Sequence, residues 1–306
     1  MKAFLLGLSL CSVVATVVIL IVPPSPASVA TQNSNPAISE TELAVYFRQK
    51  GATQTSQSHF ELADNNTHTV LGTATQTATP TPTPTLPASK SNYSIALLGD
   101  SMIDTLGETL PDLLKQLKQR FPNTNFTLLN YGAAATNIEY GLKRLTDNYS
   151  YLGKNVSALL SQNPDIIVIE SFAYNHWDNT LGDLNRQWLT LGKIVETIKS
   201  HNSNTKIVLA ATIAPYCPTY TDGSANLPPE RKFSECATVK AYLNNLINFA
   251  TSQKYPLADA FHPSLQGNEG NPLYINAGDH IHPSNEGKQL FAKTVVEAFI
   301  KNSLLL

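Results

Sequence analysis

The 306-residue sequence predicts an α/β domain with a five-stranded parallel sheet, and three observations lead to this prediction. Short apolar runs recur through the C-terminal two thirds of the chain, and segments with helical spacing of leucines lie between most of them. The runs are almost continuously apolar, as is typical of parallel strands that helices cover on both faces. The five runs are residues 93–99, 126–132, 165–171, 206–212 and 255–261.

The helical segments follow in an order that suits such a sheet. The first, LGETLPDLLKQLKQRF, lies between the first two runs and carries its basic residues near the end, where they favour a helix C-terminus. Of three further segments, one precedes the fourth run, one precedes the fifth run and one closes the chain. Residues 92–306 have the length of one such domain.

The N-terminus predicts export. Residues 3–22 are uncharged and mostly apolar, long enough to span a bilayer, and the preceding Lys2 favours a cytoplasmic N-terminus. Residues 1–22 are therefore a signal-anchor that leaves a single-pass protein with its domain outside. Alternatively they belong to a signal peptide cleaved after the small residues 28–30, which would give a secreted protein.

Residues 23–91 predict a stalk rather than a packed domain. The segment ends in TATQTATPTPTPTLPASK, and alternating Thr and Pro favour an extended spacer. One short helix is predicted near residues 39–50, where Ser39 and Glu42 fit a capping box.

The composition excludes one class of partner. The formal net charge is −2, and the chain has no long basic run, so nothing favours nucleic acid as a ligand. No cofactor is predicted. Acidic and histidine side chains late in the sequence could form a metal site, but they lack a compact ligand spacing. They are Asp259, His262, Asp279, His280 and His282.

Reactive or small residues follow four of the five runs. In an open α/β sheet, ligands bind beyond the carboxyl ends of the strands. The segments that follow the runs are Gly99-Asp100-Ser101-Met102, Gly132, Ala173-Tyr174-Asn175-His176 and, after a longer loop, Asp279-His280-Ile281-His282-Pro283. These segments are therefore expected at one edge of the sheet.

Ser101 has a candidate base in the last of these segments. In a turn that leads into a helix, Asp279 and His282 lie on the same side, so the carboxylate can hold the imidazole while its Nε2 accepts the Ser101 proton. Ser284 is a suitable N-cap for the helix that follows. His280 is expected to lie outside this pair, at the surface.

An oxyanion hole can be built from the other segments. The candidates are the backbone N–H groups of Ser101 and Gly132 and the side-chain amide of Asn175. Gly132 suits this role because it has no Cβ to block a close approach. Tyr174, His176 and Trp177 either line the substrate pocket or begin the next helix.

Together these motifs resemble the SGNH, or GDSL-type, hydrolase family. The family's Ser, Gly, Asn and His correspond to Ser101, Gly132, Asn175 and His282, and its triad acid corresponds to Asp279. The resemblance implies a three-layer flavodoxin-like fold and serine esterase activity. Met102 replaces the usual Leu after GDS, and Ala173-Tyr174-Asn175-His176 replaces the usual G-x-N-D.

The cysteines fit an exported domain. Cys11 lies inside the apolar run, whereas Cys217 and Cys236 flank a segment that contains Pro and Gly. We expect these last two to form a disulfide, against the alternative of two free thiols.

The functional hypothesis is therefore an exported esterase with the triad Ser101, His282 and Asp279. Its expected substrates are short acyl esters, such as acetyl groups, on cell-envelope or extracellular glycans. One alternative is acyl transfer to a glycan by the same triad, and another is a non-catalytic surface module that binds glycan.

Overall fold

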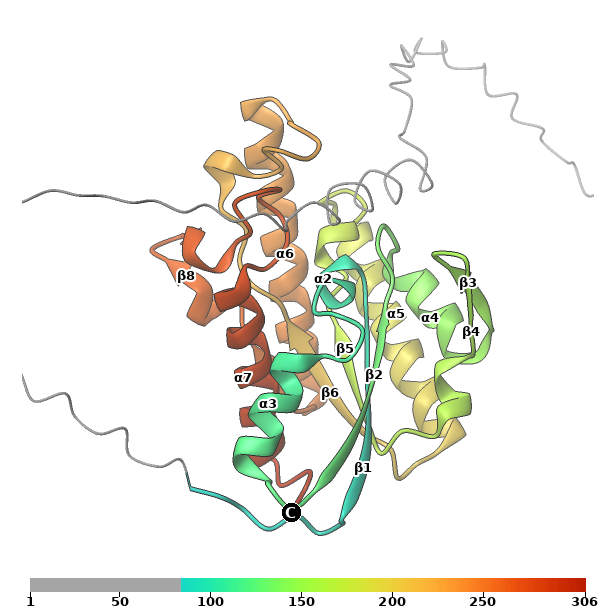
Figure 1. Cartoon of the computed structure of the whole chain (residues 1–306). Coiled ribbons are helices and arrows are strands. Elements are labelled where there is room, and N and C mark those ends of the chain that lie inside the picture. Colours follow the sequence, from blue (N-terminus) through green and yellow to red (C-terminus); the bar gives the residue numbers. More distant parts are fainter. Residues whose placement is uncertain (1–83) are drawn as a thin grey trace, which may run out of the picture. The chain divides into compact units, whose positions relative to one another are not determined.

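The computed structural model describes residues 84–306, which form a three-layer α/β/α domain (Figure 1). Its central sheet has five parallel strands in the order β2-β1-β5-β6-β7. The strands are β1 (Asn92–Gly99), β2 (Asn125–Gly132), β5 (Ile166–Glu170), β6 (Lys206–Ala211) and β7 (Leu257–Asp259). The predicted fold class and the five-stranded parallel sheet are thus confirmed.

Alternation along the strands creates the two helical layers. In β1, Leu97 faces the helices α3 (Pro111–Arg120) and α7 (Asn285–Lys301), whereas Leu98 faces the opposite layer. That second layer contains α4 (Ile138–Thr146), α5 (Leu181–His201) and α6 (Pro229–Gln253). Because both faces are covered, β1 is buried along nearly its whole length, as its apolar sequence predicts.

Several elements differ from the expected bounds. The first long helix begins only at Pro111, since proline fits the first helical position and the residues before it form turns. The helix α6 likewise begins at Pro229, earlier than its leucine pattern indicates. The hairpin of β3 (Tyr149–Tyr151) and β4 (Lys154–Val156) follows α4, and a smaller one joins β8 (Leu265–Gln266) to β9 (Glu269–Gly270).

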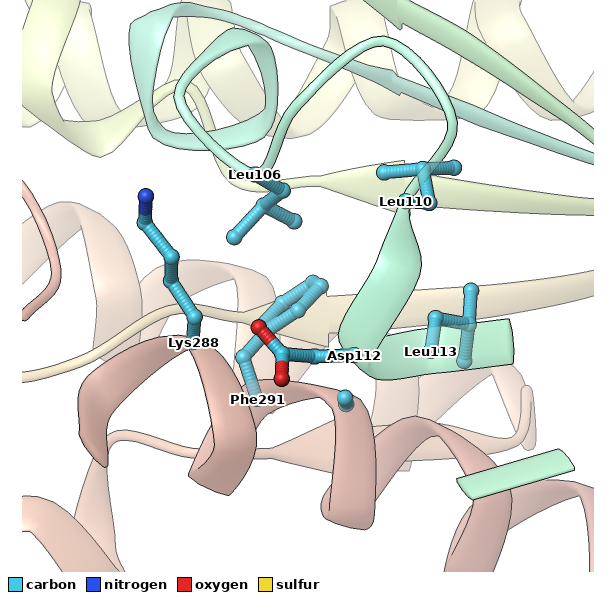
Figure 2. A pocket seen from close by; sticks show the side chains of 7 residues that line it. Leu106, Leu110, Asp112, Leu113, Lys288 and Phe291 are labelled. Carbon is cyan, nitrogen blue, oxygen red and sulfur yellow. The ribbon is translucent and has the colours of Figure 1, made fainter. Parts of the chain in front are cut away.

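The seam between α3 and α7 holds a shallow hollow (Figure 2). Leu106, Leu110 and Phe291 supply apolar walls, and Asp112 and Lys288 lie at its rim. No serine, histidine or cysteine lines this hollow, which results from helix packing. The reactive residues lie elsewhere, at the carboxyl edge of the sheet.

The last residues of the predicted stalk pack on the domain. The N–H of Leu86 donates to the carbonyl of Arg120 (2.8 Å), and the N–H of Ser89 donates to the carbonyl of Leu305 (2.7 Å). Lys90 pairs with Asp165 at 2.6 Å. The predicted anchor 1–22, the helix 39–50 and most of the stalk lie outside the described residues. Among residues 84–306, no helix has both the length and the apolar character that crossing a membrane requires.

A buried arginine joins the ends of the two neighbouring strands. Arg144 is 1% exposed, and its guanidinium donates to the carbonyls of Tyr131 (2.6 Å) and Gly99 (2.8 Å). Both carbonyls lie where β2 and β1 reach the carboxyl edge. The chain therefore uses a charged side chain inside the core to hold this edge together.

Replacing Arg144 by Met is expected to lower the free energy of unfolding by about 3 kcal/mol, because two buried carbonyls lose a charged donor. Urea unfolding followed by tryptophan fluorescence measures the loss. The matched control is Arg231→Met, since Arg231 pairs with Glu235 at 2.6 Å on the surface. An exposed pair contributes at most about 1 kcal/mol. Equal losses in the two variants would contradict the role of Arg144.

Candidate active site

Ser101 lies at the first turn after β1. Asp100 caps the one-turn helix α2 (Ser101–Asp104), and its Oδ1 accepts the N–H of Met102 at 2.8 Å. Gly99 is required before the cap, because a Cβ there would lie 2.2 Å from Cγ1 of Ile103. Ser101 occupies the first helical position, where the backbone N–H has no acceptor within the helix. The turn therefore presents both a hydroxyl and a backbone donor at the sheet edge.

Asp279 accepts three hydrogen bonds, two of which come from His282. Its Oδ2 lies 3.0 Å from His282 Nδ1, and its Oδ1 accepts the N–H groups of Ile281 (2.9 Å) and His282 (3.0 Å). Because an ionised carboxylate only accepts, Nδ1 carries the proton and Nε2 of the neutral ring is the basic nitrogen. Ser284 caps α7 through a bond from the N–H of Gly287, as predicted for this serine.

The ionisation of Asp279 suits this arrangement. Burial favours the neutral carboxylic acid, but the hydrogen bond and charge of His282 and the two backbone N–H groups outweigh it. The pKa of Asp279 is therefore lowered below its ordinary value. The carboxylate stays charged at neutral pH and can stabilise a positive imidazolium.

The same local pattern occurs a second time in the chain. The sequence D-A-F-H-P-S starts at Asp259, the last residue of β7, and the sequence D-H-I-H-P-S lies directly before α7. In the first copy, Asp259 Oδ2 lies 2.6 Å from His262 Nδ1, and Oδ1 accepts the His262 N–H at 3.1 Å. The two dyads thus share one hydrogen-bond arrangement.

Location separates the two dyads. The side chain of His262 is 54% exposed, whereas that of His282 is 6% exposed. Burial raises the pKa of both Asp100 and Asp104, and the charge of His282 opposes this rise at both residues. Pro283, the residue after His282, forms a β-bridge with Ile275, and Ile275 is buried with Met102 of α2, so the segment of His282 lies near the Ser101 turn. The other dyad ends β7, and β5 and β6 separate that strand from β1.

Asn175 also reaches the turn that contains Ser101. It ends the short 3-10 helix η2 (Ala173–Asn175) after β5, and its Nδ2 donates to Asp100 Oδ2 at 2.9 Å. Asp100 therefore accepts one bond from the backbone of α2 and one from the third sequence block. The segment Ala173-Tyr174-Asn175-His176, which departs from the usual G-x-N-D, therefore still brings its asparagine to the Ser101 turn.

Gly132 lies opposite Gly99 in the pairing of β1 with β2. A Cβ at Gly132 would lie 2.1 Å from the backbone nitrogen of Asp104, so only glycine fits against α2. Its N–H donates to Asn130 Oδ1 at 2.8 Å. The structure thus places Gly132 beside α2, with its N–H directed at Asn130.

The model of the GDSL-like lipase/acylhydrolase family matches residues 97–290 of the chain. This match covers the four sequence blocks and both dyads.

The chain belongs to this family. As a member, it is an ester hydrolase, and its substrates are esters.

Solved structures with a similar arrangement have low sequence identity to this hydrolase. A GDSL-like lipase from Bacteroides thetaiotaomicron is 15% identical, with a TM-score of 0.49, over 69% of this chain and 89% of that one. A lipase/acylhydrolase from Enterococcus faecalis is 18% identical, with a TM-score of 0.48, over 69% and 96%. A mutant acetyl-xylooligosaccharide esterase from Geobacillus stearmophilus is 16% identical, with a TM-score of 0.47, over 70% and 95%. No curated protein matches the sequence.

The three predicted substrate-binding residues lie beside Asn175 but are largely engaged with protein. The hydroxyl of Tyr174 donates to the carbonyl of Ile213 at 2.9 Å. His176 Nε2 lies 3.5 Å from Glu235 Oε2, and the guanidinium carbon of Arg186 lies 3.8 Å from the ring centre of Trp177. In this hydrolase, His176 contacts α6, Trp177 contacts α5, and Tyr174 is bonded to the segment after β6.

Glu170 is a buried carboxyl that the sequence reasoning did not single out. It ends β5, and its Oε2 accepts the N–H of Phe172 at 2.8 Å and that of Asp100 at 3.4 Å. The hydroxyl of Ser171 donates to Oε1 at 2.5 Å. Burial, followed by the charge of Asp100, holds the pKa of Glu170 well above its ordinary value. An acidic residue that ends an otherwise apolar strand is the signal that could have identified it.

Glu170 is expected to make stability fall as pH rises. Its raised folded pKa means that the native state keeps a proton that the unfolded chain releases above about pH 4.3, so the cost of folding grows above that pH. Glu170→Gln removes this cost. Between about pH 5 and about pH 8, its unfolding free energy should gain about 1 kcal/mol or more over wild type.

Urea unfolding of both proteins at the two pH values measures the difference. The control is Glu108→Gln, since the Glu108 side chain is 85% exposed and should show no such pH-dependent gain. A constant difference between wild type and Glu170→Gln across this pH range would show that Glu170 titrates as an ordinary carboxyl.

A disulfide joins Cys217 to Cys236, and so connects the 3-10 helix η3 (Cys217–Thr219) to α6. The loop beyond η3 reaches the segment that holds Asp279. The hydroxyl of Ser224 donates to the carbonyl of Asp279 at 3.0 Å, and Nδ1 of His280 lies 2.9 Å from the carbonyl of Asp222. His280 therefore contacts this loop.

The suggested metal cluster divides into separate pairs. Asp259 pairs with His262, and Asp279 pairs with His282. In the described part of the chain, the one group of potential ligands close enough for a metal is Cys217, Cys236 and Glu269. Both of these cysteines are in the disulfide.

Proposed function

We propose that this hydrolase is an exported serine esterase that removes short acyl groups from extracellular or cell-envelope glycans. The catalytic residues in this proposal are Ser101, His282 and Asp279. The observation that carries it is the buried His282–Asp279 dyad, whose segment packs through Ile275 against Met102, the residue after Ser101. The equivalent dyad at the end of β7 is exposed.

Each step uses a group that the geometry supports. Ser101 Oγ attacks the ester carbonyl while Nε2 of His282 takes its proton, and the Oγ–carbon bond forms. His282 then returns the proton to the departing alcohol as the ester C–O bond breaks. Water attacks the acyl-enzyme in the same way and releases the acid and Ser101. Asp279 orients the ring and stabilises the imidazolium in both halves.

The oxyanion is held by three donors in this proposal. The N–H of Ser101 is supplied by the first helical position of α2. Asn175 has two amide protons, and its bond to Asp100 uses only one of them. The N–H of Gly132 shares its bond between Asn130 Oδ1 and the oxyanion, as three-centre hydrogen bonds allow.

Export is supported by the apolar N-terminal run and by the disulfide, which persists in oxidising compartments. We place the domain outside the cell, either tethered by residues 1–22 or released after cleavage. Protease treatment of intact cells that produce the chain tests this. Complete protection of the domain until the cells are lysed would contradict export.

A fluorophosphonate probe tests the chemistry directly, because it reacts with an activated serine and leaves an inert hydroxyl unmodified. The expected result is a single adduct on Ser101, located by peptide mapping of residues 84–306. Absence of the adduct would favour the non-catalytic glycan-binding module. Product analysis with an acetylated glycan and a free sugar acceptor separates hydrolysis from acyl transfer, since only transfer acetylates the acceptor.

A further inference from the structure

A groove beside the triad acid has no role in the steps described above. Tyr216 and Thr219 form one wall, in the segment that follows β6. The other wall precedes α7 and consists of Pro272, Ile275, Ala277 and His280. The cavity volume is about 130 Å³. Sites that enclose a whole small molecule typically measure about 300–1,000 Å³, so this groove can receive only part of a substrate, such as one face of a ring.

The groove is connected to the Ser101 turn through a small buried cluster. Met102 directly follows Ser101 and is buried with Ile213 and Ile275, and Tyr216 packs against this small cluster. At the other wall, His280 directly follows Asp279. Two of the groove's lining residues thus contact the cluster that contains Met102, and a third adjoins the triad acid. An ester has two parts that could occupy a groove connected to Ser101 in this way, the acyl group and the alcohol.

The lining chemistry distinguishes between those two parts. Tyr216, Pro272, Ile275 and Ala277 supply an aromatic ring and aliphatic surface, while Thr219 supplies a hydroxyl. A pyranose ring has an apolar C–H face that stacks on an aromatic ring, and hydroxyls that need hydrogen-bonding partners. A fatty acyl chain needs only the apolar surface, and would leave the polar groups unpaired.

His280 adds a polar group with a fixed orientation. Its Nδ1 lies 2.9 Å from the carbonyl of Asp222, which can only accept, so Nδ1 carries the proton. Nε2 of the neutral ring is then an acceptor for a hydroxyl. The backbone of His280 has φ 53°, an unusual conformation that its N–H bond to the carbonyl of Asn276 (2.9 Å) helps to hold.

Both walls are fixed before any ligand arrives. The Cys217–Cys236 disulfide anchors the wall of Tyr216 and Thr219 to α6. The N–H of Gly270 donates to the carbonyl of Pro215 at 3.0 Å, which connects this wall to the segment before Pro272. A preorganised groove loses little entropy when it binds, and this favours recognition of a rigid ring.

We infer that this groove binds the sugar ring whose hydroxyl carries the ester, with Tyr216 as the stacking surface and Thr219 and His280 as hydrogen-bonding partners. This inference rests on the proposed function, because it assigns the alcohol part of a glycan ester to a place in the fold. The acyl group then lies on the other side of Ser101.

The test compares two acetate esters with different alcohols. The values of kcat/KM are measured for glucose pentaacetate and for ethyl acetate by titration of released acid. Tyr216→Ala should lower kcat/KM for the sugar ester about 10–100-fold more than for ethyl acetate, mainly through KM. Thr219→Val, which keeps the side-chain shape, should give a smaller preference of about 3–10-fold.

Tyr255→Ala is the matched control, since Tyr255 is a half-buried tyrosine just before the amino end of β7. Its ratio of the two kcat/KM values should equal that of wild type. Equal losses on both esters in Tyr216→Ala would overturn the inference. So would a larger loss on p-nitrophenyl octanoate than on the sugar ester, because the groove would then hold the acyl chain.

The outcomes also separate this inference from the proposed function. If wild type cleaves the sugar ester and Tyr216→Ala has the same kcat/KM values as wild type, only the role of the groove is overturned. If wild type cleaves ethyl acetate but no acetylated sugar, including acetylated xylan, the proposed substrate class is overturned. The sugar-binding role of the groove is then overturned as well.

Discussion

Replacing His282 by Ala is expected to lower kcat/KM for p-nitrophenyl acetate by about 10³–10⁵-fold, because Ser101 loses its proton acceptor. His262→Ala is expected to stay within about twofold of wild type, since an exposed side chain outside the site contributes little. Each of the two histidines follows an aspartate by three residues, precedes Pro-Ser and has its Nδ1 bonded to that aspartate. They therefore form a matched pair in which only the location differs.

Initial rates at saturating and limiting ester concentrations measure both variants. Fluorophosphonate labelling should follow the same order, with slow labelling in His282→Ala and normal labelling in His262→Ala. Urea unfolding shows whether either variant has lost its fold. A large loss in His262→Ala together with a small loss in His282→Ala would assign the base to the other dyad.

Ser101→Ala is expected to abolish turnover, lowering kcat by about 10⁴–10⁶-fold, because no acyl-enzyme can form. The variant should keep the fold, since a serine-to-alanine change removes one oxygen at a helix start that Asp100 caps. The measurement is hydrolysis of p-nitrophenyl acetate with an active-site titration of wild type.

Ser234→Ala is the control for this substitution, because Ser234 lies on the surface of α6. It should retain wild-type turnover and label normally with the fluorophosphonate. Turnover by Ser101→Ala above one tenth of the wild-type rate would exclude Ser101 as the nucleophile.

The sequence predicted those parts of the fold and site that depend on local pattern. The apolar runs gave the five parallel strands because both faces of each strand are buried. The bond between Asp279 and His282 was predictable, since three residues of a tight turn decide it. Asn175 was predicted at the same edge as Ser101, because parallel strands end together.

Other parts of the site depend on contacts that no local pattern encodes. Arg144 and Glu170 are buried by packing between segments that lie far apart in the chain. The direction of the Gly132 N–H depends on the side chain of Asn130. Finally, the dyad that ends β7 and the dyad before α7 have the same sequence spacing, so only their burial distinguishes them.

The docking of residues 86–90 determines where the chain enters the domain. Leu86 and Ser89 bond to Arg120 and Leu305, so the chain enters the domain close to its own C-terminus (Figure 1). From there β1 carries the chain through eight residues to the Ser101 turn, a rise of about 26 Å. The point where the chain enters the domain and the Ser101 turn thus lie at opposite ends of β1. A surface that bound residues 86–90 would therefore leave the Ser101 turn, the proposed site of ester cleavage, on the far side of the domain.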